Sequence, residues 1–444
     1  MTALWDSLSV PVQDALWLAM LLVPALAVGG LVLRGLRPWP LVRAMLWRFR
    51  GPNLLFLVLI AVAVGLGIGL LAQERGLRAG TAAAADKFDM IVAAPGSEMT
   101  MLLAAVYLQP SDVGLLSGDV FAGIAGHPNV AMAAPLAFGD SYKGAPVVGT
   151  IADFVRHLGD DRIEGRMFET STEAVAGAFA PVALGEVFEP AHGVGDVAQD
   201  DDNRHAHAGA GFHVVGRMAP TGTPWDRALI VPIEAVWEVH GLANGHAPAP
   251  ADAADPLGPP FDAAYFPGTP AIVIRSDALW ANYALRSTFT REAETMAFFP
   301  GAVLAQLYRV MGDVRQAMSV MALVSQVLVA ASVLVGLLIL IRLFRRQLAL
   351  LRALGAPARF VFAVVWSYAA SLLAAGAVLG LGVGWLAAAV LSRVLSARTD
   401  ILIAASLGWP ELHFVAGFLS VATVLALLPG VAVRRMKIVD ALRG

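Results

Sequence analysis

Five long apolar runs without a charged residue constrain this chain more than any other feature of its sequence. They are Ala15 to Leu33, Leu54 to Ala72, Ser319 to Ile341, Phe360 to Leu391 and Phe414 to Val433. A helix of about 20 apolar residues is long enough to cross a bilayer, and 58% of the 444 residues are hydrophobic. The sequence therefore predicts an α-helical membrane protein with five transmembrane helices.

Basic and acidic residues are segregated along the chain. Segments 34–50, 342–359 and 434–444 hold 14 of the 31 Lys and Arg residues and a single acid, Asp440, whereas residues 73–316 hold 29 acids against 15 basic residues. Loops rich in Lys and Arg stay in the cytoplasm. We therefore expect the three basic segments to be cytoplasmic and the acidic block to be exported.

The first apolar run differs from a secretory signal peptide in the charges around it. Asp6 and Asp14 precede it, and arginines follow it. A signal peptide has the basic residues first. This run is therefore predicted to be a retained helix with its N-terminus outside the cytoplasm.

Several functions are excluded by residues that the sequence lacks. There is no cysteine, which excludes disulfides and thiolate metal sites. None of the three lysines, Lys87, Lys143 and Lys437, ends a phosphate-binding loop, so another chain would have to bind ATP. No hydrolase motif is present, and the apolar runs contain no ionisable group of the kind that ion-driven carriers use. We expect no catalytic residues and no nucleic-acid partner.

The basic segment Arg342 to Phe360 contains five arginines and no acid, and its pattern is helical up to Gly355. It resembles the cytoplasmic coupling segment of FtsX-like and MacB-type ABC transporter permeases (type VII), although Gln347 stands where that family usually has a glutamate. The segment Leu41 to Arg50 is similar to the elbow helix of these permeases. The tail, Pro429 to Gly444, resembles their closing signature.

The resemblance implies a fold with a large extracytoplasmic α+β domain of MacB periplasmic core type. The exported block opens with Phe88–Val92, which is predicted to be a strand. Five further β-type runs are similar to that core in order and spacing, namely Gly165–Phe168, Pro181–Gly185, Gly195–Asp196, Phe212–Gly216 and Ala228–Pro232. Between Gly241 and Pro270 the composition predicts a flexible surface loop. From Ser287 to Met318 the apolar spacing predicts a helical stalk.

Six regions are expected in sequence order. They are an extra N-terminal transmembrane helix (1–36), the elbow and first core transmembrane helix (37–72), the periplasmic domain with its stalks (73–316), a transmembrane helix (317–342), the coupling segment (343–359), and two transmembrane helices with a cytoplasmic tail (360–444).

In the family that the chain resembles, the coupling segment contacts a separate ABC ATPase subunit, which binds ATP and magnesium. The residues expected to make this contact are Arg345, Arg346, Leu350, Leu351, Arg352, Ala353, Leu354 and Gly355. The resemblance also implies a homodimer in the bacterial inner membrane, with the N-terminus and the large domain in the periplasm and the C-terminus in the cytoplasm.

A tract of histidines and aspartates precedes the β-type run Phe212–Gly216, and His213 lies within that run. Asp200, Asp201, Asp202, His205, His207 and His213 supply imidazoles and carboxylates, the ligands that zinc accepts when thiolates are absent. One hypothesis is a zinc site in this loop, and the alternative is a solvated acidic loop.

Gly376, Gly380 and Gly384 fall four residues apart on one helix face and permit close helix packing. This packing is either within one chain or across a dimer seam.

Three hypotheses for the function stay open at this point. The permease handles a divalent metal such as zinc, or it exports or extracts a peptide, lipid or lipoprotein, or it is a non-transporting, FtsX-like regulator of a periplasmic partner.

Overall fold

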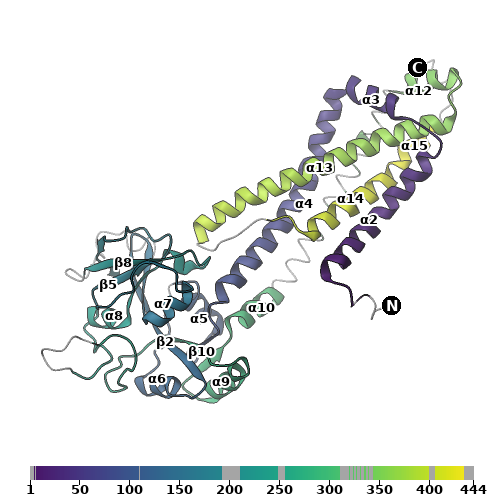
Figure 1. Cartoon of the computed structure of the whole chain (residues 1–444). Helices are drawn as coiled ribbons and strands as arrows, with labels where there is room; N and C mark the ends of the chain where they lie inside the picture. The colour runs from purple at the N-terminus through teal and green to yellow at the C-terminus, as the bar shows by residue number, and fades with distance from the viewer. Residues whose placement is uncertain are drawn as a thin grey trace. The chain divides into compact units, whose positions relative to one another are not determined.

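A computed structural model of the chain describes residues 5, 7–109, 111–192, 211–248, 256–310, 344–399 and 406–434, together with seven isolated positions between 320 and 339. The chain divides into two compact units (Figure 1). The helical unit comprises residues 1–77, 312–394 and 404–444, and the sheet unit comprises residues 78–311 and 395–403.

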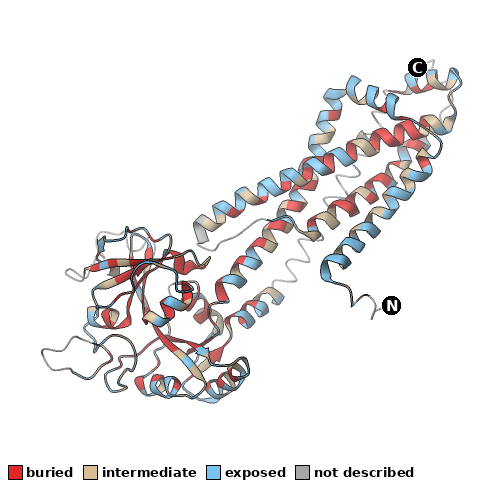
Figure 2. Ribbon diagram, in the orientation of Figure 1, coloured by how far each residue is buried: buried red, intermediate tan, exposed pale blue. Residues whose placement is uncertain are grey.

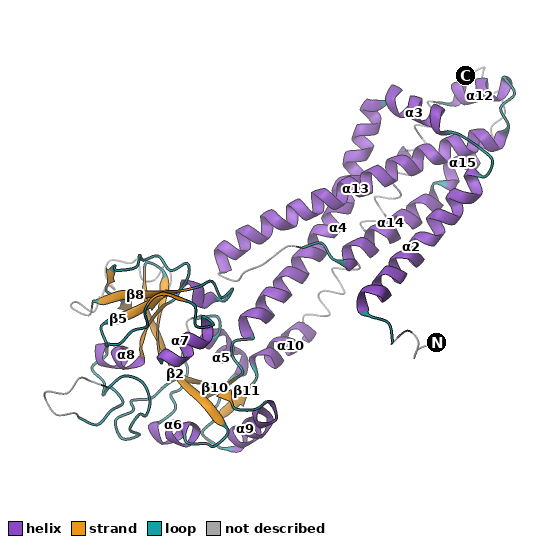
Figure 3. Ribbon diagram, viewed as in Figure 1, coloured by secondary structure: helices purple, strands orange, loops and turns teal. Residues whose placement is uncertain are grey.

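Helices make up the described part of the helical unit (Figure 3). They are α2 (Val10–Leu33), α3 (Trp39–Arg48), α4 (Arg50–Ala85), α12 (Arg345–Ala353), α13 (Ala358–Thr399), α14 (Trp409–Leu425) and α15 (Leu427–Arg434). Among the described residues, α2, α4 and α13 are long and apolar enough to cross a membrane, and α14 is a shorter apolar helix. The chain is therefore a membrane protein. Helix α4 continues from the helical unit into the sheet unit.

Two of the five predicted spans differ from the structure or cannot be compared with it. The run from Ser319 to Ile341 falls mostly outside the described residues. The run from Phe414 to Val433 is divided, because α14 ends at Leu425 and α15 follows. Pro429 explains the break, since proline has no N–H to donate to the carbonyl of Leu425.

Helix α13 packs against α4 through its glycines. A Cβ atom on Gly376 would lie 2.6 Å from Ile60, and one on Gly384 would lie 2.6 Å from the backbone oxygen of Gly65. Gly380 similarly faces Val64. The structure thus places the glycine face of α13 against another helix of the same chain.

The extra N-terminal helix α2 is fastened to α14 by polar groups. The Ser420 hydroxyl donates to the carbonyl oxygen of Leu21. Nearer the start of α14, Nε2 of His413 lies 2.8 Å from the carbonyl oxygen of Asp14. The outer side of α2 remains largely exposed (Figure 2), which suits a helix whose apolar surface faces lipid.

The sheet unit is built on one mixed sheet with the strand order β11-β1-β10-β2-β3-β9-β5-β8-β4, and β6 and β7 pair with β8 and β2. The strands are β1 (Met90–Ala93), β2 (Val130–Tyr142), β3 (Ala145–Thr150), β4 (Ile163–Gly165), β5 (Glu173–Ala176), β6 (Val187–Phe188), β7 (Ala191–His192), β8 (Phe212–Met218), β9 (Leu229–Pro232), β10 (Ala271–Ser276) and β11 (Met296–Phe298). Strand β3 is parallel to β9, and β5 is parallel to β8.

Short helices pack against this sheet. They are α5 (Glu98–Ala105), α6 (Gly118–Ala125), α7 (Ala152–Leu158), α8 (Ile233–Val239), α9 (Leu279–Arg291) and α10 (Pro300–Val310). Trp225 is fully buried in the largest core cluster and donates from Nε1 to the carbonyl oxygen of Ala105 at 3.2 Å. Phe88 and Phe154 pack their rings against it.

Three of the predicted β-type runs correspond to strands of this unit. The runs beginning at Phe88, Phe212 and Ala228 correspond to β1, β8 and β9. The run Gly165–Phe168 lies mostly after β4, and Pro181–Gly185 forms turns rather than a strand. Gly195–Asp196 lies outside the described residues.

Two further expectations were wrong in part. Within Gly241–Pro270, which was predicted to be a flexible loop, Phe266 is buried and stacks on Phe121 at 4.8 Å between ring centroids. The predicted continuous stalk helix is interrupted, because β11 lies between α9 and α10 and buries Ala297 and Phe298 against β1. Aromatic burial overrides local composition in the first case, and sheet pairing overrides helical spacing in the second.

Candidate coupling site

Helix α12 is held in the helical unit by one apolar face. Leu348 and Ala349 are buried. At its start, the ring of Phe344 packs edge-on against Phe49, with 4.3 Å between the centroids, and against Tyr368. Gly355 ends the segment with a φ of +97°, a left-handed conformation that favours glycine. The segment therefore has a fixed orientation on the helices around it.

The other face of α12 is exposed. Leu354 is 81% exposed and Leu350 is 48% exposed. Arg346 and Ala353 are also exposed, and Leu351 and Arg352 are partly buried. Exposed leucines beside an arginine are typical of a surface that a partner protein covers.

A pocket of about 550 Å³ lies between α12 and the elbow helix α3. From α3 its lining includes Leu41, Met45 and Arg48, and from α12 it includes Gln347 and Leu351. The lining is mainly apolar. Leu351, which was expected to contact an ATPase subunit, thus faces this pocket as well as the surface.

The comparison with known families decides the identity of this part of the chain. Residues 319–439 match the family model of the FtsX-like permease C-terminal domain. This part of the chain is an FtsX-like permease domain. The match spans the helices from α12 to α15 and confirms the resemblance to FtsX-like ABC permeases. A search of curated proteins finds no match to the chain.

The FtsX-like permease domain does not contain the predicted zinc ligands, which belong to the sheet unit. Asp200, Asp201, Asp202, His205 and His207 lie outside the described residues. His213 is exposed on β8, opposite Val187 of β6. Among the described residues no group of three or more His, Asp or Glu could hold a metal ion. The zinc hypothesis stays a prediction.

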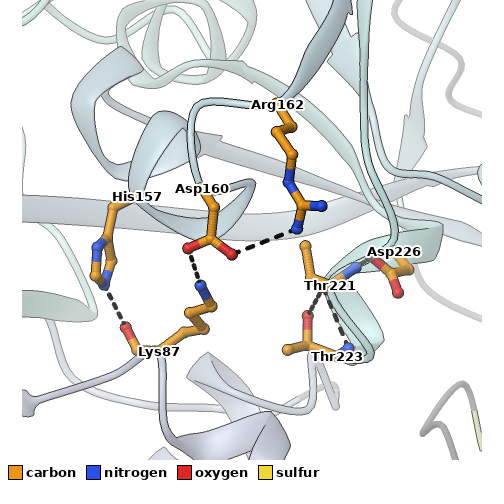
Figure 4. Close-up of polar contacts among 7 residues, drawn as sticks. All are labelled: Lys87, His157, Asp160, Arg162, Thr221, Thr223 and Asp226. Carbon is orange, nitrogen blue, oxygen red and sulfur yellow. Dashed lines mark hydrogen bonds and ion pairs between the residues drawn. The ribbon is translucent and has the colours of Figure 1, made fainter.

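Sequence reasoning missed a polar cluster where the permease chain leaves α4 and enters β1 (Figure 4). Lys87 forms an ion pair with Asp160, and Asp160 also lies 3.6 Å from Arg162. Nε2 of His157 lies 3.0 Å from the carbonyl oxygen of Lys87, so this nitrogen carries the proton. The hydrogen bond from Lys87 lowers the pKa of the Asp160 carboxyl.

This cluster connects distant parts of the sheet. Lys87 precedes β1, near one end of the strand order, and Asp160 precedes β4, at the other end. Asp160 and Asp161 both lie in a turn with positive φ, 50° and 57°, and Asp160 forms its ion pair from there. A contact 73 residues away leaves no local signal in a sequence.

Proposed function

We propose that the chain is the membrane subunit of an ABC transporter and that a separate ATPase subunit drives it. The observation that carries this proposal is the exposed leucine face of α12 within the matched FtsX-like domain. ATP binding and hydrolysis in the partner would move α12. Because α4 packs on α13 and continues into the sheet unit, the motion would reach that unit through α4.

In this proposal the basic end of the helical unit faces the cytoplasm of a bacterial inner membrane, since basic segments stay inside. The N-terminus and the sheet unit, of MacB periplasmic core type, would then be periplasmic. Two copies of the chain would assemble as a homodimer. ATP and magnesium would be held by the partner, since no lysine of this chain belongs to a phosphate-binding loop.

The composition of the apolar runs bears on the substrate class. Because these runs contain no ionisable group, the permease suits mechanical work outside the membrane. Export or extraction of a peptide, lipid or lipoprotein is one such role, and regulation of a periplasmic partner is another. Handling of zinc remains the third hypothesis.

The experiment that tests the coupling site is purification of the full chain together with its ATPase subunit from bacterial membranes. We expect Leu354→Asp to lower the amount of co-purified ATPase activity by about tenfold or more, because it places a charge in an apolar contact. Leu242→Asp is the matched control, since Leu242 is a half-exposed leucine of the sheet unit. Equal ATPase activity in Leu354→Asp and in the wild type would refute the assignment of α12.

A further inference from the structure

The pocket between α3 and α12 lies where a membrane protein meets lipid headgroups. Helices α2 and α4 are both long and apolar enough to cross a membrane, and the short α3 connects the end of one to the start of the other. Helix α3 must therefore lie at the surface of the bilayer that α2 and α4 cross. Any pocket that α3 lines opens at the same surface.

The shape and lining of the pocket suit an acyl chain. Its volume of about 550 Å³ falls within the range of about 300–1,000 Å³ typical of small-molecule sites. Leu41, Met45, Leu348 and Leu351 contribute apolar side chains. An acyl chain that enters from the bilayer would cover them without crossing water.

The charges around the pocket suit an acidic headgroup. Segments 34–50 and 344–359 together contain nine arginines and no acid. Arg48 lines the pocket itself and is exposed. Beside it, the guanidinium of Arg50 lies 6.0 Å from the ring centre of Trp47, which is 75% exposed. An aromatic ring paired with a cation is a typical anchor at the membrane surface.

We propose that this pocket binds one acidic phospholipid, with an acyl chain among the leucines and the phosphate bound by Arg48. A helix of a partner protein is the competing occupant. The phospholipid is favoured because the pocket opens at the bilayer surface and because an anion complements the arginines. The proposal does not rest on an ATPase partner.

Gln347 gives the proposal a second test. Its uncharged amide lines the pocket beside Arg48. A carboxylate there would repel a phosphate held by Arg48. The substitution Gln347→Glu preserves the shape of the side chain and adds this one charge.

Native mass spectrometry of the full chain in detergent tests the proposal. The probes are phosphatidylglycerol and phosphatidylcholine with identical acyl chains. We expect the wild type to retain one phosphatidylglycerol. Arg48→Gln should bind this lipid about tenfold or more weakly, because it loses a hydrogen bond to the charged phosphate. Gln347→Glu should weaken binding by about as much, because its carboxylate repels the phosphate. Arg43→Gln is the matched control, since Arg43 is an exposed arginine of α3 that does not line the pocket.

A second measurement places the lipid in the pocket. Phosphatidylglycerol with brominated acyl chains should quench part of the tryptophan fluorescence of the wild type in vesicles, and Trp47→Phe should remove that part. Equal retention of the two lipids, equal binding by Arg48→Gln and the wild type, or quenching that persists without Trp47 would each overturn the proposal. A polypeptide that occupies the pocket instead of lipid would also overturn it.

Discussion

Arg75 of α4 forms an ion pair with Glu411 in the first turn of α14, with 2.6 Å between Nη1 and Oε2. Glu411 is completely buried, and its Oε2 also accepts the backbone N–H of Gly408 at 2.8 Å. Arg75 lies so close to Gly408 that a Cβ atom there would meet the guanidinium at 2.3 Å. This ion pair therefore joins α4 to α14, and it requires a glycine at position 408 because a side chain there would displace Arg75.

We expect Arg75→Ala to lower the free energy of unfolding of the chain in detergent by about 3 kcal/mol, measured by thermal unfolding. Removing one partner of a buried pair costs about 3–5 kcal/mol because a buried charge is left without compensation. The lower end of this range applies because the Arg75 side chain is one-third exposed.

Two further variants distinguish this ion pair from a general effect of charge. Arg393→Ala removes an exposed arginine of α13 and should leave stability unchanged. The double variant Arg75→Met with Glu411→Leu should recover most of the loss, because it removes both buried charges together. A double variant as unstable as Arg75→Ala would show that the charge of Glu411 is not the cause.

The glycine seam between α4 and α13 gives a second prediction. Gly384→Ala should destabilise the chain by about 1–3 kcal/mol, since the added methyl group would lie 2.6 Å from the backbone oxygen of Gly65. Gly382→Ala is the matched control, because a Cβ atom there meets nothing within 4 Å. Equal thermal midpoints for the two variants would contradict the close packing of these helices.

The sequence predicted those parts of the structure that depend on short-range patterns. The apolar runs predicted α2, α4 and α13, and the basic pattern before Gly355 predicted α12. Short-range patterns cannot show which residues meet across long separations. The Arg75–Glu411 pair joins positions 336 residues apart, and neither residue lies within a predicted apolar run.

The candidate coupling site was likewise predictable from short-range patterns but not in its tertiary contacts. The composition of the coupling segment identified it, but not which of its leucines are exposed. Leu351 and Leu354 look equivalent in the sequence, whereas the packing of α3 and Phe344 covers one side of the helix and leaves Leu354 outside. Tertiary contacts therefore determine which of the two leucines is exposed.

The Lys87–Asp160 ion pair gives a third prediction. Asp160→Asn should increase hydrogen exchange in peptides covering residues 86–93 and 159–165, because it removes the charge that holds Lys87. Asparagine tolerates the positive φ of this position, so the turn itself is retained. Asp161→Asn is the control, because Asp161 is a neighbouring acid of similar backbone conformation. This variant should leave hydrogen exchange in both peptides unchanged. Equal exchange in the two variants would show that the ion pair does not restrain the start of β1.

Acid should release a second ion pair of the sheet unit. Arg166 donates to Glu173 on β5, with 2.7 Å between Nη1 and Oε2, and the backbone N–H of Glu169 donates to the same oxygen at 2.8 Å. The bond from Arg166 is the main cause that lowers the pKa of Glu173 from 4.5 to about 2. A carboxyl with a lowered pKa stabilises the fold above its unfolded pKa, and this contribution is lost as the pH falls through the folded value.

We therefore expect protection of the peptide covering residues 166–176 to be full above about pH 4.5 and to decline toward pH 2 in the full chain, after correction for intrinsic exchange rates. Glu173→Gln should show reduced protection already at pH 6 and little further decline, because its amide cannot ionise. Glu164→Gln, at an exposed carboxylate on β4, serves as the control and should follow the wild type. If Glu173→Gln retained wild-type protection at pH 6, the ion pair with Arg166 would not be what orders this segment.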